Sequence, residues 1–385
     1  MITAYIGWRI CTSGAGSCSV CGARSEHLLT IANNNNGTIS LTGVSAGTVN
    51  LSYTPTDDLG CVAAAPVTLT VSVRALPTAN ITGTNAICGD GVSATVLNGN
   101  GAVTPPAAIT THAWSITAGG ALITMAGAGN AATETFTSVS TTVGGVATVQ
   151  YVLTDNFGCD VTVTYDVTVH PRPTVDITPT GPVCEDGTLT LNGQPTGGSG
   201  TYMTHTWGDI NATGTAAAAI TNNNDGTADI TFTGIGTIDI TYTVTDNNGC
   251  SSTQDVQTIT IDGRPTAVIA AAPNEVCLNQ SIVIDATPTP VAPATIASHA
   301  WTITPGTGNG TLSSATIEDP TFTGTTAGTV TLTYVTTDNN GCTSIPVDHV
   351  VTVNPLPTVS VPAGEDDEVC INGNIDFAVT VADGS

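Results

Sequence analysis

Apolar and polar residues alternate along most of the chain, and the alternation is clearest in one segment that occurs four times. Its most regular copy reads Ile-Thr-Tyr-Thr-Val-Thr-Asp-Asn-Asn-Gly-Cys over residues 240–250. Each copy places a tyrosine eight residues before a cysteine, and these tyrosines are Tyr53, Tyr151, Tyr242 and Tyr334. A period of two predicts a β-strand with one buried face, and the following Asp, Asn and Gly predict a tight turn. The repeated unit is therefore a strand, a turn and a cysteine that begins the next strand.

The pattern also recurs on a larger scale, which predicts several domains of one kind. Pro-Thr pairs begin at Pro77, Pro173, Pro265 and Pro357, at intervals of 92–96 residues. Between two such pairs the sequence holds about seven short alternating segments and no helical pattern of useful length. We predict an all-β chain of tandem immunoglobulin-like or PKD-like β-sandwich domains in a linear array. The proline at each joint predicts a stiff connector.

The domain boundaries are predicted near the Pro-Thr pairs. Residues 76–171, 172–263 and 264–355 each read as a complete domain. Residues 1–75 read as a partial domain that begins at its third strand, because Trp8-Arg-Ile aligns with Trp114-Ser-Ile and Trp301-Thr-Ile. Residues 356–385 supply the first two strands of a further domain. Either the chain is a window of a longer repetitive protein, or these strands are donated to a neighbouring subunit.

The eleven cysteines follow the repeat from Cys88 onward. One kind follows a short turn before a strand, and the other ends the Asp-x-x-Gly-Cys turn. Pairing each cysteine of the first kind with the next of the second predicts one disulfide per domain: Cys88–Cys159, Cys184–Cys250 and Cys277–Cys342. Unpaired thiols are the alternative. Cys61 and Cys370 then have their partners elsewhere, in another subunit or in further chain. Regular pairing predicts an oxidising, extracellular compartment.

Residues 9–31 do not fit the repeat. Cys11, Cys18 and Cys21 are followed by His27, so a zinc site is one interpretation. A local insertion, or a substitute partner for Cys61, agrees better with an oxidising compartment. The sequence assigns these three cysteines no definite role.

An aromatic pair marks each complete domain. A tryptophan recurs on the predicted third strand, and the repeated tyrosine lies on the strand before the turn. We predict that these residues form the core: Trp114, Trp207, Trp301, Tyr151, Tyr242 and Tyr334. A histidine two residues before each tryptophan is predicted at the edge of the core. One histidine per domain, without a second ligand nearby, is a poor candidate for a metal ligand or a general base.

Composition and charge narrow the function. The chain has no lysine, five arginines and a formal net charge of −25, which argues against nucleic acid and anionic membranes because both bind basic patches. No apolar stretch reaches the roughly 18 residues of a membrane span. No nucleophile with a base, phosphate loop or metal-ligand spacing recurs, so we predict no enzyme activity, no catalytic residue and no cofactor.

Calcium is the open ligand question. Acidic turns cluster near the predicted disulfides, and their candidate ligands are Asp90, Asp155, Asp186 and Asp246. The third complete domain has Leu278-Asn279 where the second has Glu185-Asp186, which weakens a shared site. Turn formation is the alternative explanation of these carboxylates.

The Tyr-x-Val-Thr-Asp-x-x-Gly-Cys segment, the Pro-Thr joints and the strand tryptophans resemble the PKD-like and immunoglobulin-like repeats of very large secreted proteins in Bacteroidota. That group includes gliding-motility adhesins exported by the type IX system. The resemblance covers nearly all of residues 32–385 as a class of domain. It implies an exported, filamentous protein of the cell surface that often binds polysaccharide or surfaces.

The first residues have neither a basic segment nor an apolar core, so they do not predict a signal peptide. A cytoplasmic protein is one interpretation, and an export signal elsewhere is the other, which the cysteines favour. We therefore predict a structural repeat region of an extracellular filament or giant cell-surface adhesin. Its partners are copies of itself joined end to end, or further chain, with a glycan or surface ligand possible. The alternatives are a carbohydrate-binding array and the accessory region of a secreted hydrolase.

Overall fold

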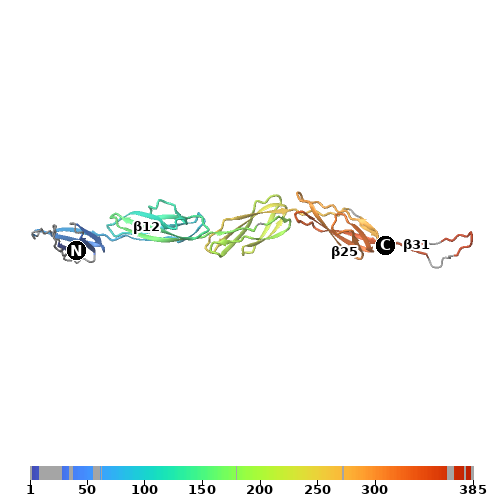
Figure 1. Cartoon of the computed structure of the whole chain (residues 1–385), viewed down its shortest axis with the longest axis horizontal. Coiled ribbons are helices and arrows are strands. Elements are labelled where there is room, and N and C mark those ends of the chain that lie inside the picture. Colours follow the sequence, from blue (N-terminus) through green and yellow to red (C-terminus); the bar gives the residue numbers. More distant parts are fainter. Residues whose placement is uncertain are drawn as a thin grey trace, which may run out of the picture. The chain divides into compact units, whose positions relative to one another are not determined.

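The computed structural model describes residues 2–7, 28–33, 38–54, 61, 63–178, 180–270, 273–361, 368–376 and 379–382. These residues form the strands β1 to β31 and no α-helix (Figure 1). The chain divides into two compact units. The first unit contains Met1–Thr174, Thr196–Met203 and Thr245–Ser252, and the second contains Val175–Pro195, Thr204–Val244 and Thr253–Ser385. Below, the second, third and fourth repeats are residues 76–171, 172–263 and 264–355, and their boundaries remain predictions.

The second repeat is a sandwich of two four-stranded sheets (Figure 1). One sheet has the order β10 (Ile123–Met125), β11 (Thr133–Ser138), β8 (Ala94–Ala102), β6 (Thr78–Thr82). The other has the order β7 (Ala86–Cys88), β13 (Asp160–His170), β12 (Gly145–Asp155), β9 (Ile109–Ala118). Only the short β7 runs parallel to its neighbour, β13. This order, with the first strand split between the sheets, is that of an immunoglobulin-like domain.

The third and fourth repeats have the same order in their larger sheets. These sheets are β15 (Val183–Cys184), β22 (Asp255–Asp262), β21 (Gly236–Asp246), β18 (Tyr202–Ile210), and β23 (Glu275–Cys277), β29 (Val347–Asn354), β28 (Gly328–Asp338), β25 (Ile296–Pro305). The facing sheets are β16 (Thr188–Asn192), β20 (Thr227–Thr233), β19 (Ala217–Asn222), and β24 (Ser281–Val283), β27 (Thr321–Thr326), β26 (Asn309–Leu312). The short strands β14 (Pro173–Thr174) and β17 (Thr196–Gly197) pair with each other. The chain is thus an all-β protein of tandem immunoglobulin-like sandwiches.

The first 75 residues depart from this plan. The strand β1 (Ile2–Gly7) lies beside β4 (Gly47–Thr54), which in turn pairs with β5 (Val67–Val73), and β2 (Leu29–Asn33) pairs with β3 (Ile39–Gly43). A third strand should run antiparallel to its neighbour, as β9 does to β12, but β1 runs parallel to β4. A parallel neighbour needs a long crossover rather than a hairpin. Trp8, on which the alignment depended, lies outside the described residues. At the other end, β30 (Thr358–Ser360) pairs with β31 (Thr380–Ala382).

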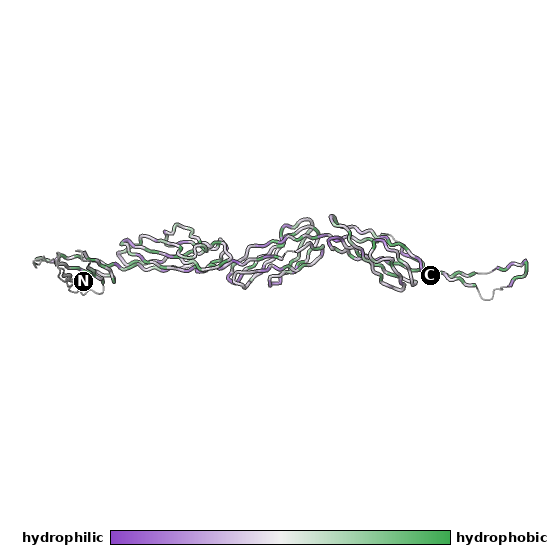
Figure 2. Tube along the Cα trace, viewed as in Figure 1, coloured by the Kyte–Doolittle hydropathy of each residue, from purple (hydrophilic) through white to green (hydrophobic). Residues whose placement is uncertain are grey.

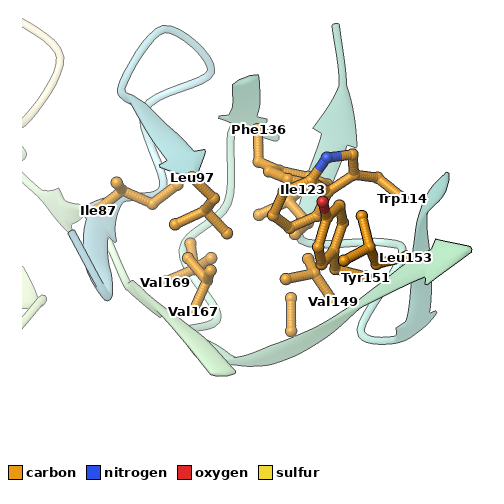
Figure 3. Close-up of a cluster of buried hydrophobic side chains, with 11 residues drawn as sticks. Ile87, Leu97, Trp114, Ile123, Phe136, Val149, Tyr151, Leu153, Val167 and Val169 are labelled. Atoms are coloured by element: carbon orange, nitrogen blue, oxygen red, sulfur yellow. The ribbon is translucent and has the colours of Figure 1, made fainter. Parts of the chain in front are cut away.

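The alternation of apolar and polar residues is visible along the strands of the complete repeats (Figure 2). In the second repeat, Leu97 and Phe136 come from one sheet and point toward Val149 and Val167 of the other (Figure 3). All four side chains are fully buried. The fourth repeat builds an equivalent cluster around Phe322. The apolar residues at every second position of the strands therefore form the two facing layers of each core.

A tryptophan, a tyrosine and a histidine pack together at one place in each complete repeat. The centroid of the tyrosine ring lies 4.6 Å from that of Trp114, 4.3 Å from that of Trp207 and 4.5 Å from that of Trp301. The tyrosines are fully buried, as are two of the tryptophans to within a few per cent, whereas Trp207 is half-buried. Each tyrosine hydroxyl lies 2.5–2.7 Å from Nδ1 of the half-buried histidine, in the pairs His112–Tyr151, His205–Tyr242 and His299–Tyr334.

The predicted pairing of cysteines within each domain is wrong. The structure instead contains the disulfides Cys88–Cys250 and Cys184–Cys342, with Cα–Cα distances of 5.4 and 5.5 Å. The reason is the length of the last strand. In the second repeat Cys88 lies opposite His170 at one end of β13, and Cys159 directly precedes its other end. Eleven residues of strand separate them by on the order of 30 Å, whereas a disulfide needs Cα atoms within about 7 Å.

Candidate functional site: the disulfide-linked repeat junctions

Hydrogen bonds within the Asp-x-x-Gly-Cys turn fix the backbone of its cysteine. In the second, third and fourth repeats the aspartate is buried, and its Oδ1 accepts hydrogen bonds from two backbone N–H groups in the turn. The second of these N–H groups belongs to the cysteine itself, at 2.9 Å for Cys159, 2.9 Å for Cys250 and 2.8 Å for Cys342. The glycine before each cysteine has φ of 78–87°, a left-handed conformation that favours glycine. The motif therefore sets the position of the sulfur relative to the sandwich.

The other kind of cysteine is held with equal regularity. Cys88, Cys184 and Cys277 end the short strands β7, β15 and β23, which run parallel to the last strand of the same repeat. The backbone N–H of the next residue donates to a carbonyl at the end of that last strand. The three bonds are Gly89 to His170, Glu185 to Asp262 and Leu278 to Asn354, each of 2.8 Å. We call this place the exit end of a repeat.

Each disulfide joins the exit end of one repeat to the turn of the next. Cys88 of the second repeat bonds Cys250 in the turn of the third, and both lie in the first compact unit. Cys184 of the third repeat bonds Cys342 in the turn of the fourth, and both lie in the second unit. The sequence separations are 162 and 158 residues. Residues 245–252 of the third repeat, which include Cys250, belong to the same compact unit as the second repeat.

Every arginine that the structure describes contacts a junction. The Cζ atom of Arg74 lies 4.1 Å above the ring centroid of Phe157, in the turn of the second repeat, a cation–π contact. Nε of Arg172 donates to the carbonyl of Ser251, directly after Cys250, at 2.8 Å. Nε of Arg264 donates to the carbonyl of Glu185, directly after Cys184, also at 2.8 Å. The scarce positive charges thus brace the connectors and the residues next to the disulfides.

The Gly-Gly-Ser-Gly loop of the third repeat completes the first junction. The backbone N–H of Ser199 donates to Oδ2 of Asp246 at 2.8 Å. Burial, together with the nearby Asp246 carboxylate, raises the pKa of Tyr202. In the second and fourth repeats, Oδ2 of the equivalent Asp155 and Asp338 is buried without a hydrogen-bond partner. Of these three described turns, that of the third repeat is therefore the one whose aspartate is hydrogen-bonded through both oxygens.

Three of the four candidate calcium ligands, Asp90, Asp155 and Asp246, accept hydrogen bonds from the protein itself. Burial raises the pKa of Asp90, but hydrogen bonds from Ser93, Val92 and Ser138 outweigh it and hold the pKa at about 2. Asp90 follows the exit end of the second repeat, while Asp155 belongs to the turn at its opposite end. Asp186 lies in the turn after β15 with φ of 57°. Across the described residues, no three His, Cys, Asp or Glu side chains gather in a metal-binding arrangement.

The remaining cysteines that the sequence singled out are dispersed. Cys61, Cys277 and Cys370 are exposed, and Cys159 is half-buried. Cys11, Cys18, Cys21 and His27 lie outside the described residues. Sequence reasoning recognised both kinds of cysteine but missed that they meet across a junction. The available signal was the long alternating strand between Cys159 and His170, which cannot be spanned by a disulfide.

Comparisons with known proteins add similarities of fold at low identity. No family model matches the chain, and no curated protein sequence matches it significantly. Among solved structures, a titin fragment of three immunoglobulin domains is 14% identical and covers 74% of this chain and 99% of its own, with a TM-score of 0.34. Invasin, a bacterial integrin-binding protein, is 15% identical and covers 88% of this chain and 73% of its own, with a TM-score of 0.32. Fibronectin(III)-like modules of Clostridium thermocellum CbhA are 15% identical over 48% of this chain and 94% of their own, with a TM-score of 0.25.

These TM-scores are low, so the immunoglobulin-like assignment depends on the strand order and the parallel β7–β13 pairing described above. In the described part of the chain, no helix is long and apolar enough to span a membrane.

Proposed function

We propose that this chain is a structural repeat region of an extracellular filament or a large cell-surface adhesin, similar in kind to the repeat adhesins of Bacteroidota. Its work is to provide reach and stiffness. The observation that supports this most directly is the disulfide across each of the two junctions between complete repeats. Domains joined only by short connectors move relative to each other by default. A covalent bond at a second point removes most of that freedom.

The chemistry of the junctions agrees with an extracellular setting. Disulfides persist in oxidising compartments and are rare where glutathione keeps thiols reduced. Cys250 and Cys342 are almost completely buried in their junctions, which limits access of small reductants. The formal net charge of −25 keeps copies in solution apart except where specific contacts form.

A glycan-binding array is less well supported. Recognition of sugars by stacking needs aromatic side chains on the surface. Among the described tryptophans, Trp114 and Trp301 are buried and Trp207 is half-buried, and the repeated tyrosines Tyr151, Tyr242 and Tyr334 are fully buried. Phe157 is exposed, but Arg74 lies over one face of its ring.

Two measurements test the proposal. Immunogold electron microscopy of the producing cells, with antibodies against the complete repeats, should label the cell surface or filaments. Label confined to the cytoplasm would reject the proposed location. Small-angle X-ray scattering should show a narrower range of conformations for the oxidised chain than for the chain reduced and alkylated. Equal flexibility in the two states would reject the stiffening role.

A further inference from the structure

The two observed junctions define a rule for cysteine pairing. A cysteine at the exit end of one repeat bonds the turn cysteine of the next repeat. The rule has two independent instances, one in each compact unit. It also predicts which cysteines have partners beyond the two observed junctions. The exit cysteine of the fourth repeat is Cys277, and its partner must lie in the turn of a repeat that follows.

The exit end of the fourth repeat is built like those already cross-linked. Its strand β23 pairs parallel with β29, placing Cys277 opposite Asn354, just as Cys88 lies opposite His170. The N–H of Leu278 donates to the carbonyl of Asn354 at the same 2.8 Å found at the other two exit ends. The backbone around Cys277 therefore needs no rearrangement to form this bond.

Cysteines in disulfides are more buried than those that are thiols, both at the exit ends and in the turns. The exit cysteines Cys88 and Cys184 are half-buried in disulfides, whereas Cys277 is a thiol and is exposed. The turn cysteines Cys250 and Cys342 are 0% and 1% exposed, whereas the thiol of Cys159 is more exposed. Among the described residues, no turn of a neighbouring repeat covers the exit end of the fourth repeat, whereas such a turn covers the other two.

We propose that Cys277 forms a disulfide with the cysteine of an Asp-x-x-Gly-Cys turn in a further immunoglobulin-like repeat. No such sequence occurs in residues 356–385, so the partner turn comes from a second copy of this chain or from a repeat beyond these residues. Both sources present the same chemistry, the thiol of a cysteine that ends an Asp-x-x-Gly-Cys turn. The proposal deepens the structural function proposed above, because it makes the fourth repeat a covalent attachment point.

The bond forms by two thiol–disulfide exchanges. The Cys277 thiolate attacks a disulfide of an oxidoreductase or of oxidised glutathione, which releases one thiolate of that oxidant. The turn thiolate then attacks the mixed disulfide at the Cys277 sulfur and releases the second thiolate. In total two cysteine thiols lose two protons and two electrons, and one oxidant disulfide is reduced to two thiols.

The test is disulfide mapping on protein isolated from the cells that produce it. Thiols are blocked with N-ethylmaleimide before lysis, and the unreduced protein is digested at aspartate and glutamate, because the chain has no lysine. We expect more than half of the Cys277 peptide to be linked to a turn peptide. A link to Cys61 or Cys159 identifies a second copy as the source. A link to a turn of different sequence identifies a further repeat.

A Cys277 peptide that carries N-ethylmaleimide, or that is linked to any cysteine outside such a turn, would overturn the proposal. As a second readout, Cys277→Ser in the producing cells should convert its partner turn peptide to the N-ethylmaleimide form while leaving Cys88–Cys250 and Cys184–Cys342 intact. Cys370→Ser, the matched control, should leave the Cys277 link unchanged. Surface labelling that persists while Cys277 remains a thiol would reject the attachment and leave the structural function in place.

Discussion

Pulling the chain from its two ends should reveal that its disulfides act as one interlocked pair. The closed loops overlap, because Cys184 lies inside the loop closed by Cys88–Cys250. Residues 88–184, 184–250 and 250–342 therefore connect the same two cross-linked points in parallel. The perturbation is removal of one disulfide, by Cys88→Ser with Cys250→Ser or by Cys184→Ser with Cys342→Ser, compared with removal of both by reduction.

The expected lengths follow from the shortest covalent path. With both disulfides the path runs through residues 1–88, 184–250 and 342–385, about 200 residues or ~670 Å at ~3.4 Å per residue. Removing either disulfide alone lengthens the path by only about 30 residues, or ~100 Å. Removing both releases the whole chain, a gain of about 190 residues, or ~640 Å. The two effects are far from additive.

The assay is single-molecule force spectroscopy with attachment at both termini, other thiols alkylated, and contour lengths fitted after complete extension. Disulfides within each domain would instead give independent gains of roughly 65–70 residues, or ~230 Å, for each bond removed. Additive gains of that size would refute the junction pairing. A contour length that does not change on reduction would show that neither disulfide is present.

Three further outcomes are expected. Gly193→Ala should destabilise the third repeat by about 1–3 kcal/mol in denaturant unfolding, because the added Cβ would overlap the ring of Tyr242; Gly181→Ala, which has open space around it, should stay within about 0.5 kcal/mol. Because the pKa of Asp90 in the folded protein is about 2, below its ordinary value of 3.8, the contribution of this carboxylate to folding stability is present above pH ~4 and is lost as the pH falls through ~2. Asp90→Asn should flatten this part of the pH–stability profile measured by circular dichroism, and an unchanged profile would contradict the assignment. Arg172→Ala should speed reduction of Cys88–Cys250 about fivefold, from loss of one hydrogen bond worth about 1 kcal/mol, without affecting Cys184–Cys342. Arg264→Ala should do the reverse, and equal effects on both bonds would contradict local bracing.

Much of the fold could be predicted from the residues because the determining signals are local. The alternation around Tyr242 fixes a strand with one buried face, and Asp246 with Gly249 fixes the turn after it. The repeated tryptophan and tyrosine mark facing positions, and in the structure Trp114 lies opposite Tyr151 in the strand register. The strand β19, rich in alanine and placed before an Asn-rich turn, carries a weaker alternation and was not predicted.

The junctions could not be predicted because they depend on distances along strands. Cys88 and Cys159 are close in sequence, but the folded sandwich holds them at opposite ends of β13. The neighbouring repeat that supplies the second cysteine is set by the connector at Arg172-Pro173. The alternation of apolar and polar residues does not encode the geometry of that connector. The orientation of β1 was also missed, because a parallel neighbour and an antiparallel one have the same period of two.

The overlap of the two loops also constrains the order of events during biogenesis. As the chain emerges, Cys88 meets Cys159 and Cys184 before Cys250 has been made. Once the second repeat has folded, the length of β13 keeps Cys159 out of reach, so early folding of the sandwich protects against the nearest wrong partner. The correct bond must wait for the turn of the third repeat, and the next must wait for the fourth. Each correct disulfide therefore forms one repeat behind synthesis. A disulfide that forms earlier joins the wrong cysteines, and an isomerase would be needed to rearrange it.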